Sequence, residues 1–316
     1  MRRIWLIPLL LLAACSAPPA PSPPPGPDRW TERAAAPHAR TEVSAATLGN
    51  RIWVLGGMDD DGRPAPDVMI YDPAADRWST GPALPEGVHH AAAAGDGSRL
   101  WIAGGYVDSG SGHQPTAAVR MIDSATGTWS DGPPLPSPRG AGALAWDGSR
   151  LVFAGGVGPS SLSGDVFALE NGSWRTLGRL TTAREHLAAA SDGSGSTYFL
   201  AGRLGGLDTN RPDVDLVTGA VVTRIGAVPT ARGGVAGFYS PTHGACVAGG
   251  EQPSGTFTQV ECIRSDATTT TLPPLTTPRH GLGAVYLDGT AYALLGGPNP
   301  GLTVSPTIQA LRPTTP

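Results

Sequence analysis

Lysine is absent from the 316 residues of this chain, and all 22 of its basic residues are arginine. With 26 acidic residues the formal net charge is −4, which provides no general affinity for nucleic acid. The sequence has no phosphate-cradling glycine loop and no histidine cluster with metal-ligand spacing. The acidic run Asp59–Gly62 lacks the alternate spacing of a calcium loop. We therefore expect no nucleic-acid partner, no cofactor and no bound metal.

Long hydrophobic runs and helical periodicity are missing as well. The N-terminal apolar run from Ile4 to Leu12 is too short for a membrane span, which needs about 20 residues. Aromatic residues make up only 6% of the chain, and no stretch has a convincing helical period. Short runs such as Ile52–Leu55 and Val68–Tyr71 instead carry β-branched and aromatic residues between turn residues. This pattern predicts an all-β protein.

A glycine pair recurs along the chain at nearly constant spacing. Successive pairs are 48, 51, 47, 47 and 47 residues apart, and a period of about 45 to 50 residues suits one four-stranded propeller blade. The five pairs and one degraded copy are Gly56-Gly57, Gly104-Gly105, Gly155-Gly156, Gly249-Gly250, Gly296-Gly297 and Gly202-Arg203. We therefore predict six blades, with Arg203 in place of the second glycine of blade four.

The order of signals within each repeat resembles the kelch repeat: a hydrophobic strand, a glycine pair, an aromatic residue with Asp, and then a tryptophan. In the first copy these are Ile52–Leu55, Gly56-Gly57, Tyr71-Asp72 and Trp78. The resemblance covers about residues 28 to 312. It is weaker in blades four to six, which lack the tryptophan that Trp78, Trp129 and Trp174 supply in blades one to three. The resemblance implies a six-bladed kelch-type β-propeller with four-stranded antiparallel blades over residues 28–316.

The two ends of the repeat array complement each other. Asp28–Thr31 repeats the end-of-blade sequence Asp76–Ser79, although no blade precedes it. Blade six runs out after its third strand, near Thr307 to Arg312. Pairing the N-terminal strand with that strand would close the ring and hide two sheet edges. We predict that the N-terminal strand completes blade six.

The N-terminus predicts export. Arg2-Arg3 and the apolar run lead into Leu12–Cys15, which resembles a bacterial lipobox. The resemblance implies that residues 1–14 are a lipoprotein signal peptide and that Cys15 is lipidated. Residues 15–27 would then form a proline-rich tether. A serine directly after the cysteine, here Ser16, is similar to the sequence of lipoproteins sent to the outer membrane. The alternative is an ordinary cleaved signal peptide. We expect an exported monomer, held at the bacterial envelope by its lipid, with an unknown envelope protein or glycan as partner.

The two cysteines besides Cys15 lie in blade five. Cys246 and Cys262 are on consecutive predicted strands, each four residues from the loop ends Gly250 and Thr258. That symmetry would place them opposite each other and close enough for a disulfide in an oxidising compartment. A shift of one residue in register would instead leave two buried thiols.

The loops after the glycine pairs, such as residues 58–66 and 106–118, are long and variable, and variable loops on a rigid scaffold usually carry the binding site. The segments that lead into the innermost strands lie on the same face. They supply the candidate ligand-binding residues Arg40, Arg139, Arg184, Arg232, Arg279, His89 and His90. Arginine forks suit carboxylate or phosphate. The alternative is that each arginine ties its blade to the backbone or an acid of a neighbouring blade.

Glu185, His186 and His280 lie outside the repeat pattern and are alternative, catalytic candidates. Beside an arginine-lined mouth they could perform acid–base chemistry on an anionic sugar, and the family resembled includes exported six-bladed proteins that mutarotate sialic acid. Kelch-like copper oxidases are disfavoured because the sequence has no Tyr-His pair. The leading hypothesis is a non-enzymatic scaffold for a protein or glycan. The alternatives are a carbohydrate-active enzyme, such as a sialic-acid-type mutarotase, and a structural envelope component.

Two arrangements would separate the first two hypotheses. Convergence of Glu185, His186, His280 and the arginines within about 8 Å of one point would favour the enzyme, because acid–base catalysis needs near contact with one substrate. Dispersed, paired arginines would favour the scaffold.

Overall fold

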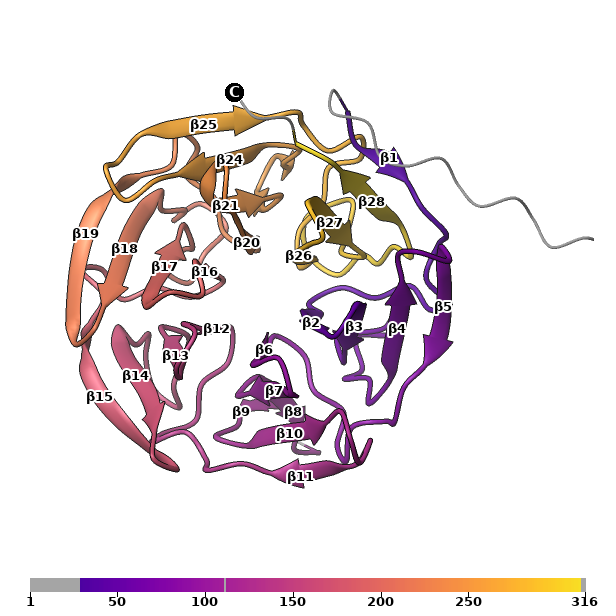
Figure 1. Ribbon diagram of the computed structural model, residues 1–316, viewed down its shortest axis with the longest axis horizontal. Coiled ribbons are helices and arrows are strands. Elements are labelled where there is room, and N and C mark those ends of the chain that lie inside the picture. Colours follow the sequence, from indigo (N-terminus) through magenta and orange to yellow (C-terminus); the bar gives the residue numbers. More distant parts are fainter. Residues whose placement is uncertain (1–28, 111, 314–316) are drawn as a thin grey trace, which may run out of the picture.

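Six antiparallel sheets of four strands surround a central axis (Figure 1). The structure is a computed structural model that describes residues 29–110 and 112–313. Within those residues the secondary structure is entirely strand, turn and loop, and none forms a helix that could span a membrane. The predicted all-β, six-bladed propeller is confirmed. The lipobox, Cys15 and the tether lie outside the described residues.

The blades follow one another around the axis in chain order. From the axis outward, blade one consists of β2 (Ser44–Leu48), β3 (Arg51–Leu55), β4 (Val68–Asp72) and β5 (Arg77–Thr80). Blade two consists of β6 (Ala92–Gly95), β7 (Arg99–Ala103), β10 (Val119–Asp123) and β11 (Trp129–Asp131). Blade three consists of β12 (Ala143–Trp146), β13 (Leu151–Ala154), β14 (Asp165–Glu170) and β15 (Ser173–Arg179).

The second half of the ring repeats this order. Blade four consists of β16 (Ala188–Ser191), β17 (Ser196–Leu200), β18 (Asp213–Thr218) and β19 (Val221–Ala227). Blade five consists of β20 (Ala236–Ser240), β21 (Gly244–Ala248), β24 (Val260–Ile263) and β25 (Thr269–Leu272). Blade six consists of β26 (Gly283–Leu287), β27 (Thr290–Leu294), β28 (Ile308–Leu311) and β1 (Thr31–Glu32).

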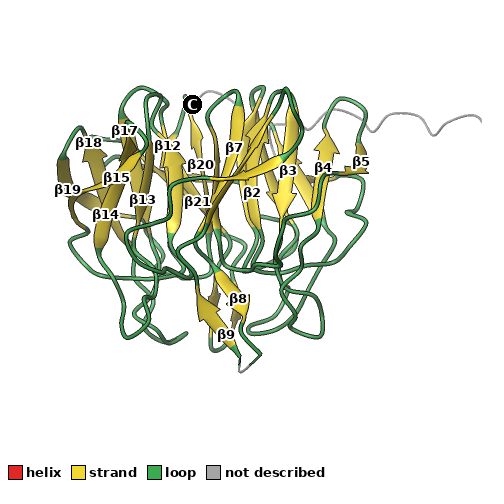
Figure 2. Cartoon of the chain, turned by 90° about the horizontal axis from the view of Figure 1, so that it is seen from below, coloured by secondary structure: helices red, strands yellow, loops and turns green. Residues whose placement is uncertain are grey.

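One face of the ring carries the long loops. Two small hairpins are formed in these loops: β8 (Tyr106–Asp108) with β9 (His113–Pro115), and β22 (Glu251–Gln252) with β23 (Gly255–Thr256). Figure 2 shows β8 and β9 projecting beyond the blades on this side. We call it the long-loop face. The segments that lead into the innermost strands open on it, so any site on the axis is framed by the most variable parts of the chain.

The N-terminal strand closes the ring. β1 pairs with β28, with Thr31 opposite Ala310. Trp30, only 1% exposed, packs into the core between blades five and six and donates its Nε1–H to the Pro273 carbonyl at 2.8 Å. Trp78, Trp129 and Trp174 make the same bond to Ala34, Pro82 and Pro133, each just after the outermost strand of the preceding blade. The end-of-blade tryptophan is therefore a tie between blades, and the ring closes as predicted.

The corner of blade four differs from the prediction. In blade one the Gly56 N–H donates to Asp67 within the blade, and the Gly57 N–H donates to the Val88 carbonyl of blade two. In blade four these two bonds come from Ala201 and Gly202. Ala201 has a φ of 55°, close to the 61° of Gly56. The first glycine is therefore the one replaced, and Arg203 follows the corner. Blade six is shifted in the same way, with Leu295-Gly296 at the corner.

Blade five contains a cross-strand disulfide. Cys246 on β21 lies directly opposite Cys262 on β24, and the two are bonded. Both are fully buried in the core between blades five and six. The bond closes a 16-residue separation, which in the chain-entropy account restricts the unfolded chain by about 3 kcal/mol.

Candidate functional site

The five predicted ligand-binding arginines lie inside the blades. Arg184 is completely buried and donates to Asp215 at 2.7 Å and to the Ala201 and Phe199 carbonyls. Arg232 pairs in the same way with Glu261. Arg139 pairs with Asp165 and Arg40 with Asp67, while Arg279 donates to the Leu295 and Thr307 carbonyls. Each partner belongs to the arginine's own blade, so these guanidinium groups are not available to a ligand and do not reach a neighbouring blade.

Neighbouring blades are tied through the backbone at the same positions. The Gly105 N–H donates to the Arg139 carbonyl and the Gly156 N–H to the Arg184 carbonyl, each from the blade before. The side chain thus holds the leader segment to its own blade, while its carbonyl binds the preceding one. An arginine-lined mouth does not form on the long-loop face, because ion pairs and hydrogen bonds within each blade hold these side chains in the blade interior.

Six residues, one from each blade, form a ring around the axis. This axial ring consists of Glu42, His90, Ala141, His186, Gly234 and Gly281. All six have left-handed backbones, with φ between 50° and 71°. From His90 onward each N–H donates to the carbonyl of the preceding member at 2.9–3.1 Å, and the Val43 N–H closes the circle on Gly281 at 3.2 Å.

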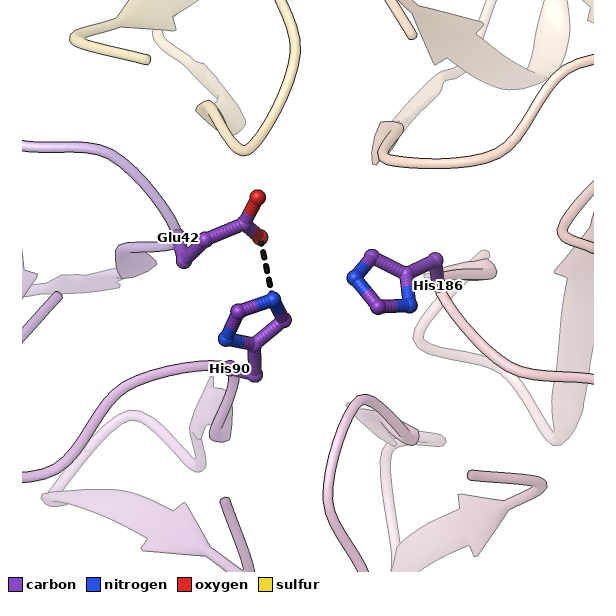
Figure 3. A group of neighbouring side chains, drawn as sticks. All are labelled: Glu42, His90 and His186. Atoms are coloured by element: carbon purple, nitrogen blue, oxygen red, sulfur yellow. Dashed lines mark ion pairs between the residues drawn. The ribbon is translucent and has the colours of Figure 1, made fainter. Parts of the chain in front are cut away.

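The axial ring holds non-glycine residues in a conformation that costs each of them about 1–2 kcal/mol. Glycine would avoid the strain, as it does in blades five and six. The backbones of Glu42, His90 and His186 retain this strained conformation, and their side chains turn toward one another (Figure 3). Glu42 Oε2 is 3.1 Å from His90 Nε2, and the rings of His90 and His186 are 4.7 Å apart between centroids. Strain retained at converging polar side chains is characteristic of functional sites.

Arg203 joins the acids and imidazoles around the axial ring. Its Nε donates to Glu185 Oε1 at 2.9 Å and its Nη1 to Glu251 Oε1 at 2.7 Å. Its Nη2 lies 2.9 Å from His186 Nε2. Glu185 in turn binds His186 Nδ1 at 2.7 Å. The shift of one residue at the corner of blade four places Arg203 here, beside the axis.

His280 connects the two ends of this network. Its Nδ1 lies 3.1 Å from the Gly297 carbonyl, an acceptor, so that nitrogen carries the proton. Its Nε2 then faces Glu42 Oε1 at 3.5 Å and Glu251 Oε2 at 3.7 Å. Glu185, His186 and His280 therefore do converge near the axis. They do so with His90 and with three residues that sequence reasoning missed, namely Glu42, Arg203 and Glu251.

The carboxylate at Glu185 is strongly stabilised as an anion. Burial would raise its pKa, but hydrogen bonds and charge from His186 and Arg203 outweigh burial and hold the pKa at about 2. Burial, reinforced by the neighbouring imidazole of His186, keeps the pKa of His90 well below its usual range. Three carboxylates thus face one guanidinium.

The axial ring surrounds a small recess. This axial recess has a volume of about 80 Å³ and is lined by the ring residues and the residue after each of them. It adjoins a channel of about 100 Å³ between the innermost strands. Pockets that enclose a drug-sized ligand measure roughly 300–1,000 Å³. The recess can therefore take an ion, a few waters or one functional group of a larger ligand.

His89, the remaining histidine candidate, lies behind the ring against Tyr106 and His113. Burial, with a smaller effect of His113, lowers the pKa of His89 to about 4. In the unfolded chain His89 takes up a proton near pH 6.5, whereas in the folded chain it does so only near pH 4. Between these pH values the unfolded chain therefore binds more protons than the folded chain. Stability then rises with pH in this window. His89 is only 4% exposed. Its protonation should therefore lower the free energy of unfolding by about 2 kcal/mol between pH 7 and pH 5.

We therefore expect the melting temperature, measured with EDTA present, to fall as the pH is lowered from 7 to 5. His89→Gln should flatten that dependence, whereas His38→Gln, at an exposed position, should not. An unchanged pH dependence in His89→Gln would show that other groups cause the acid sensitivity.

Comparison with known proteins agrees with this architecture. Residues 39–85 and 88–136, which contain blades one and two, match the Kelch motif. The fold and the motif together define a six-bladed β-propeller containing kelch motifs.

Two similar proteins are informative. The Kelch-like protein terF of Aspergillus terreus is 28% identical over 227 residues, which are 64% of this chain and 48% of that protein. The chain thus spans about half the length of this curated relative. The solved structure of YjhT superposes with a TM-score of 0.74 over 86% of this chain and 95% of that one, at 13% identity. At this identity the likeness concerns the fold alone.

Proposed function

We propose that this chain is an exported, lipid-anchored propeller that captures an envelope glycan at the axial recess without transforming it. The observation that carries the proposal is the convergence of Glu42, His90 and His186 from three blades on a strained ring at the long-loop face. The recess offers imidazole and carboxylate groups, and its lining is polar. Its size suits one hydroxyl or amine of a sugar lying over the mouth.

The charge of the site argues for neutral or amine-bearing glycans. The excess of carboxylates around Arg203 repels anionic sugars, and the arginines that could have attracted them are buried. Large exposed hydrophobic side chains among the described residues are few: Leu204, Val221 and Leu302. Protein interfaces are anchored largely by big aromatic and other hydrophobic side chains, of which the described residues expose few. A polar mouth therefore favours a glycan over a protein.

The proposal can be tested on a glycan array with the full mature chain in detergent. The ring supplies a matched set of variants, since Gly234 and Gly281 already occupy its left-handed positions. His90→Gly and His186→Gly should each weaken retention about tenfold or more, as expected for the loss of one or two hydrogen bonds. Ala141→Gly, at the equivalent place in blade three, should retain glycans like the parent. Equal retention by all four proteins would place any glycan site elsewhere.

One observation favours a second candidate, an acid–base enzyme acting on sugars. Glu185 binds His186 Nδ1 and thereby leaves Nε2 facing the axis, which is the arrangement of an oriented general base. Accelerated anomer exchange of a sugar by the purified chain, abolished in His186→Gly, would replace the non-catalytic proposal.

Anchoring is tested separately by Cys15→Ala. We expect this change to move the protein from the membrane fraction to the soluble exported fraction, because the lipid would be its only attachment. Unchanged membrane association would contradict the lipid anchor.

A further inference from the structure

We propose that the axial recess binds one divalent first-row transition-metal ion through Glu42, His90 and His186, with Zn²⁺ as the test case. The inference rests on the proposed function, since it assigns a ligand to the same recess. The bound ion would offer an open coordination position to a sugar hydroxyl. The sequence predicted no metal, because ligands from three different blades leave no motif spacing.

The geometry of the three side chains fits a shared ion. One donor atom from each can be chosen so that all three lie within 4.8 Å of one another. Glu42 Oε2 and His90 Nε2 are 3.1 Å apart. Two tetrahedral ligands at about 2.0–2.2 Å from Zn²⁺ stand roughly 3.3 Å apart, close to this separation. Figure 3 shows His186 facing that pair across the axis.

The surroundings prepare His186 as a ligand. Its Nδ1 is bound by Glu185 Oε2 at 2.7 Å, which leaves the lone pair on Nε2. A carboxylate behind a ligating histidine is the usual outer shell of a metal site, where it fixes the tautomer and orients the ring. Arg203 Nη2 lies 2.9 Å from Nε2 and identifies the direction of that lone pair. A bound ion would take the place of this donor, while Arg203 keeps its bonds to Glu185 and Glu251.

Charge supplies an independent argument. One guanidinium, that of Arg203, lies among the carboxylates of Glu42, Glu185 and Glu251. All four side chains are at most about one-tenth exposed. Buried charge is normally paired, because an uncompensated charge is strongly unfavourable in a low dielectric. A divalent cation would add positive charge beside these buried carboxylates.

The recess is also built to leave the Glu42 carboxylate room. A Cβ on Gly281 would lie 2.6 Å from Glu42 Oε1 and 2.6 Å from Thr41 Oγ1, so a larger residue there would displace the Glu42 carboxylate. Thr41 is 1% exposed, and its hydroxyl has no hydrogen-bond partner among residues 29–110 and 112–313. A buried hydroxyl without a partner beside a carboxylate is the kind of group that a metal-bound water would satisfy.

The donor set selects the class of metal. Two imidazoles and one carboxylate suit zinc and its late first-row neighbours. Calcium and magnesium prefer six or more oxygen ligands, which three side chains with two nitrogens do not provide. Three protein ligands also leave at least one coordination position for water or a sugar oxygen.

The experiment is calorimetric titration of ZnCl₂ into the full mature chain, without a histidine tag and stripped with EDTA. We expect one ion per chain and no binding of Ca²⁺ or Mg²⁺. His90→Gly and His186→Gly should each weaken binding by more than about 100-fold, because loss of an outer-shell partner alone costs 10–100-fold. Glu185→Gln, which changes an outer-shell partner, should weaken zinc binding by about 10–100-fold. Ala141→Gly should bind like the parent.

Absence of zinc binding by the parent would overturn the inference and leave Arg203 as the permanent partner of His186. Equal weakening in Ala141→Gly would do the same, since it would assign the effect to the ring backbone. If a histidine variant does not fold in EDTA, Glu42→Gln removes the carboxylate ligand with little change of shape. Glycan retention measured in EDTA and again with added ZnCl₂ separates the two proposals. Retention without zinc binding rejects the metal alone, and zinc binding without retention in either condition rejects glycan capture alone.

Discussion

Asp215→Ala is expected to destabilise the chain by about 3–5 kcal/mol, because it leaves the buried Arg184 guanidinium without its counter-charge. Both side chains are completely buried and their oxygen and nitrogen atoms are 2.7 Å apart. Asp215 also accepts hydrogen bonds from the backbone and hydroxyl of Thr181. The measurement is urea unfolding of the full chain, compared through the free energy extrapolated to water.

Two further variants make this result specific. Asp61→Ala removes the acid of an ion pair in which both side chains are more than half exposed, and should change stability by less than about 0.5 kcal/mol. Arg184→Met added to Asp215→Ala removes the uncompensated charge and should recover part of the loss. If Asp215→Ala unfolds at the same urea concentration as Asp61→Ala, Arg184 is not held in the blade by this pair.

The arginine partners illustrate a limit of sequence reasoning. Arg139, Arg184 and Arg232 occupy equivalent places, yet their acids lie 26, 31 and 29 residues further along the chain. The loop between the second and third strands varies in length from blade to blade, so the acids show no fixed spacing. The repeat therefore predicted the arginines as a set, while their burial and partners followed only from the three-dimensional structure.

The candidate site was only partly visible in the sequence for a related reason. Glycine spacing predicted the blades, but aligning the glycines alone assigned Arg203 to the corner of blade four. Backbone hydrogen bonds put Ala201 and Gly202 at that corner, which moves Arg203 to the axis. Glu42 is two residues after Arg40, as His186 is after Arg184. Alignment on the arginines would thus have grouped Glu42 with His186, although nothing in the chain predicts that left-handed backbones turn both side chains inward.

Removal of residues 29–36 is expected to have the other large effect, because they complete blade six. β28 would lose its partner β1 and expose an unpaired strand edge, which favours association with other chains. The Trp30 side chain would leave the core between blades five and six, and such a loss alone costs about 3–5 kcal/mol.

Trp30→Ala, which keeps β1, separates packing from strand pairing. It should unfold at lower urea concentration but remain monomeric, whereas the deletion should also aggregate in light scattering. Trp129→Ala is the matched control, since Trp129 makes the same inter-blade bond, to Pro82, from a partly exposed position, and should cost less. A deletion variant that melts like the parent and stays monomeric would mean that the ring does not depend on its N-terminal strand.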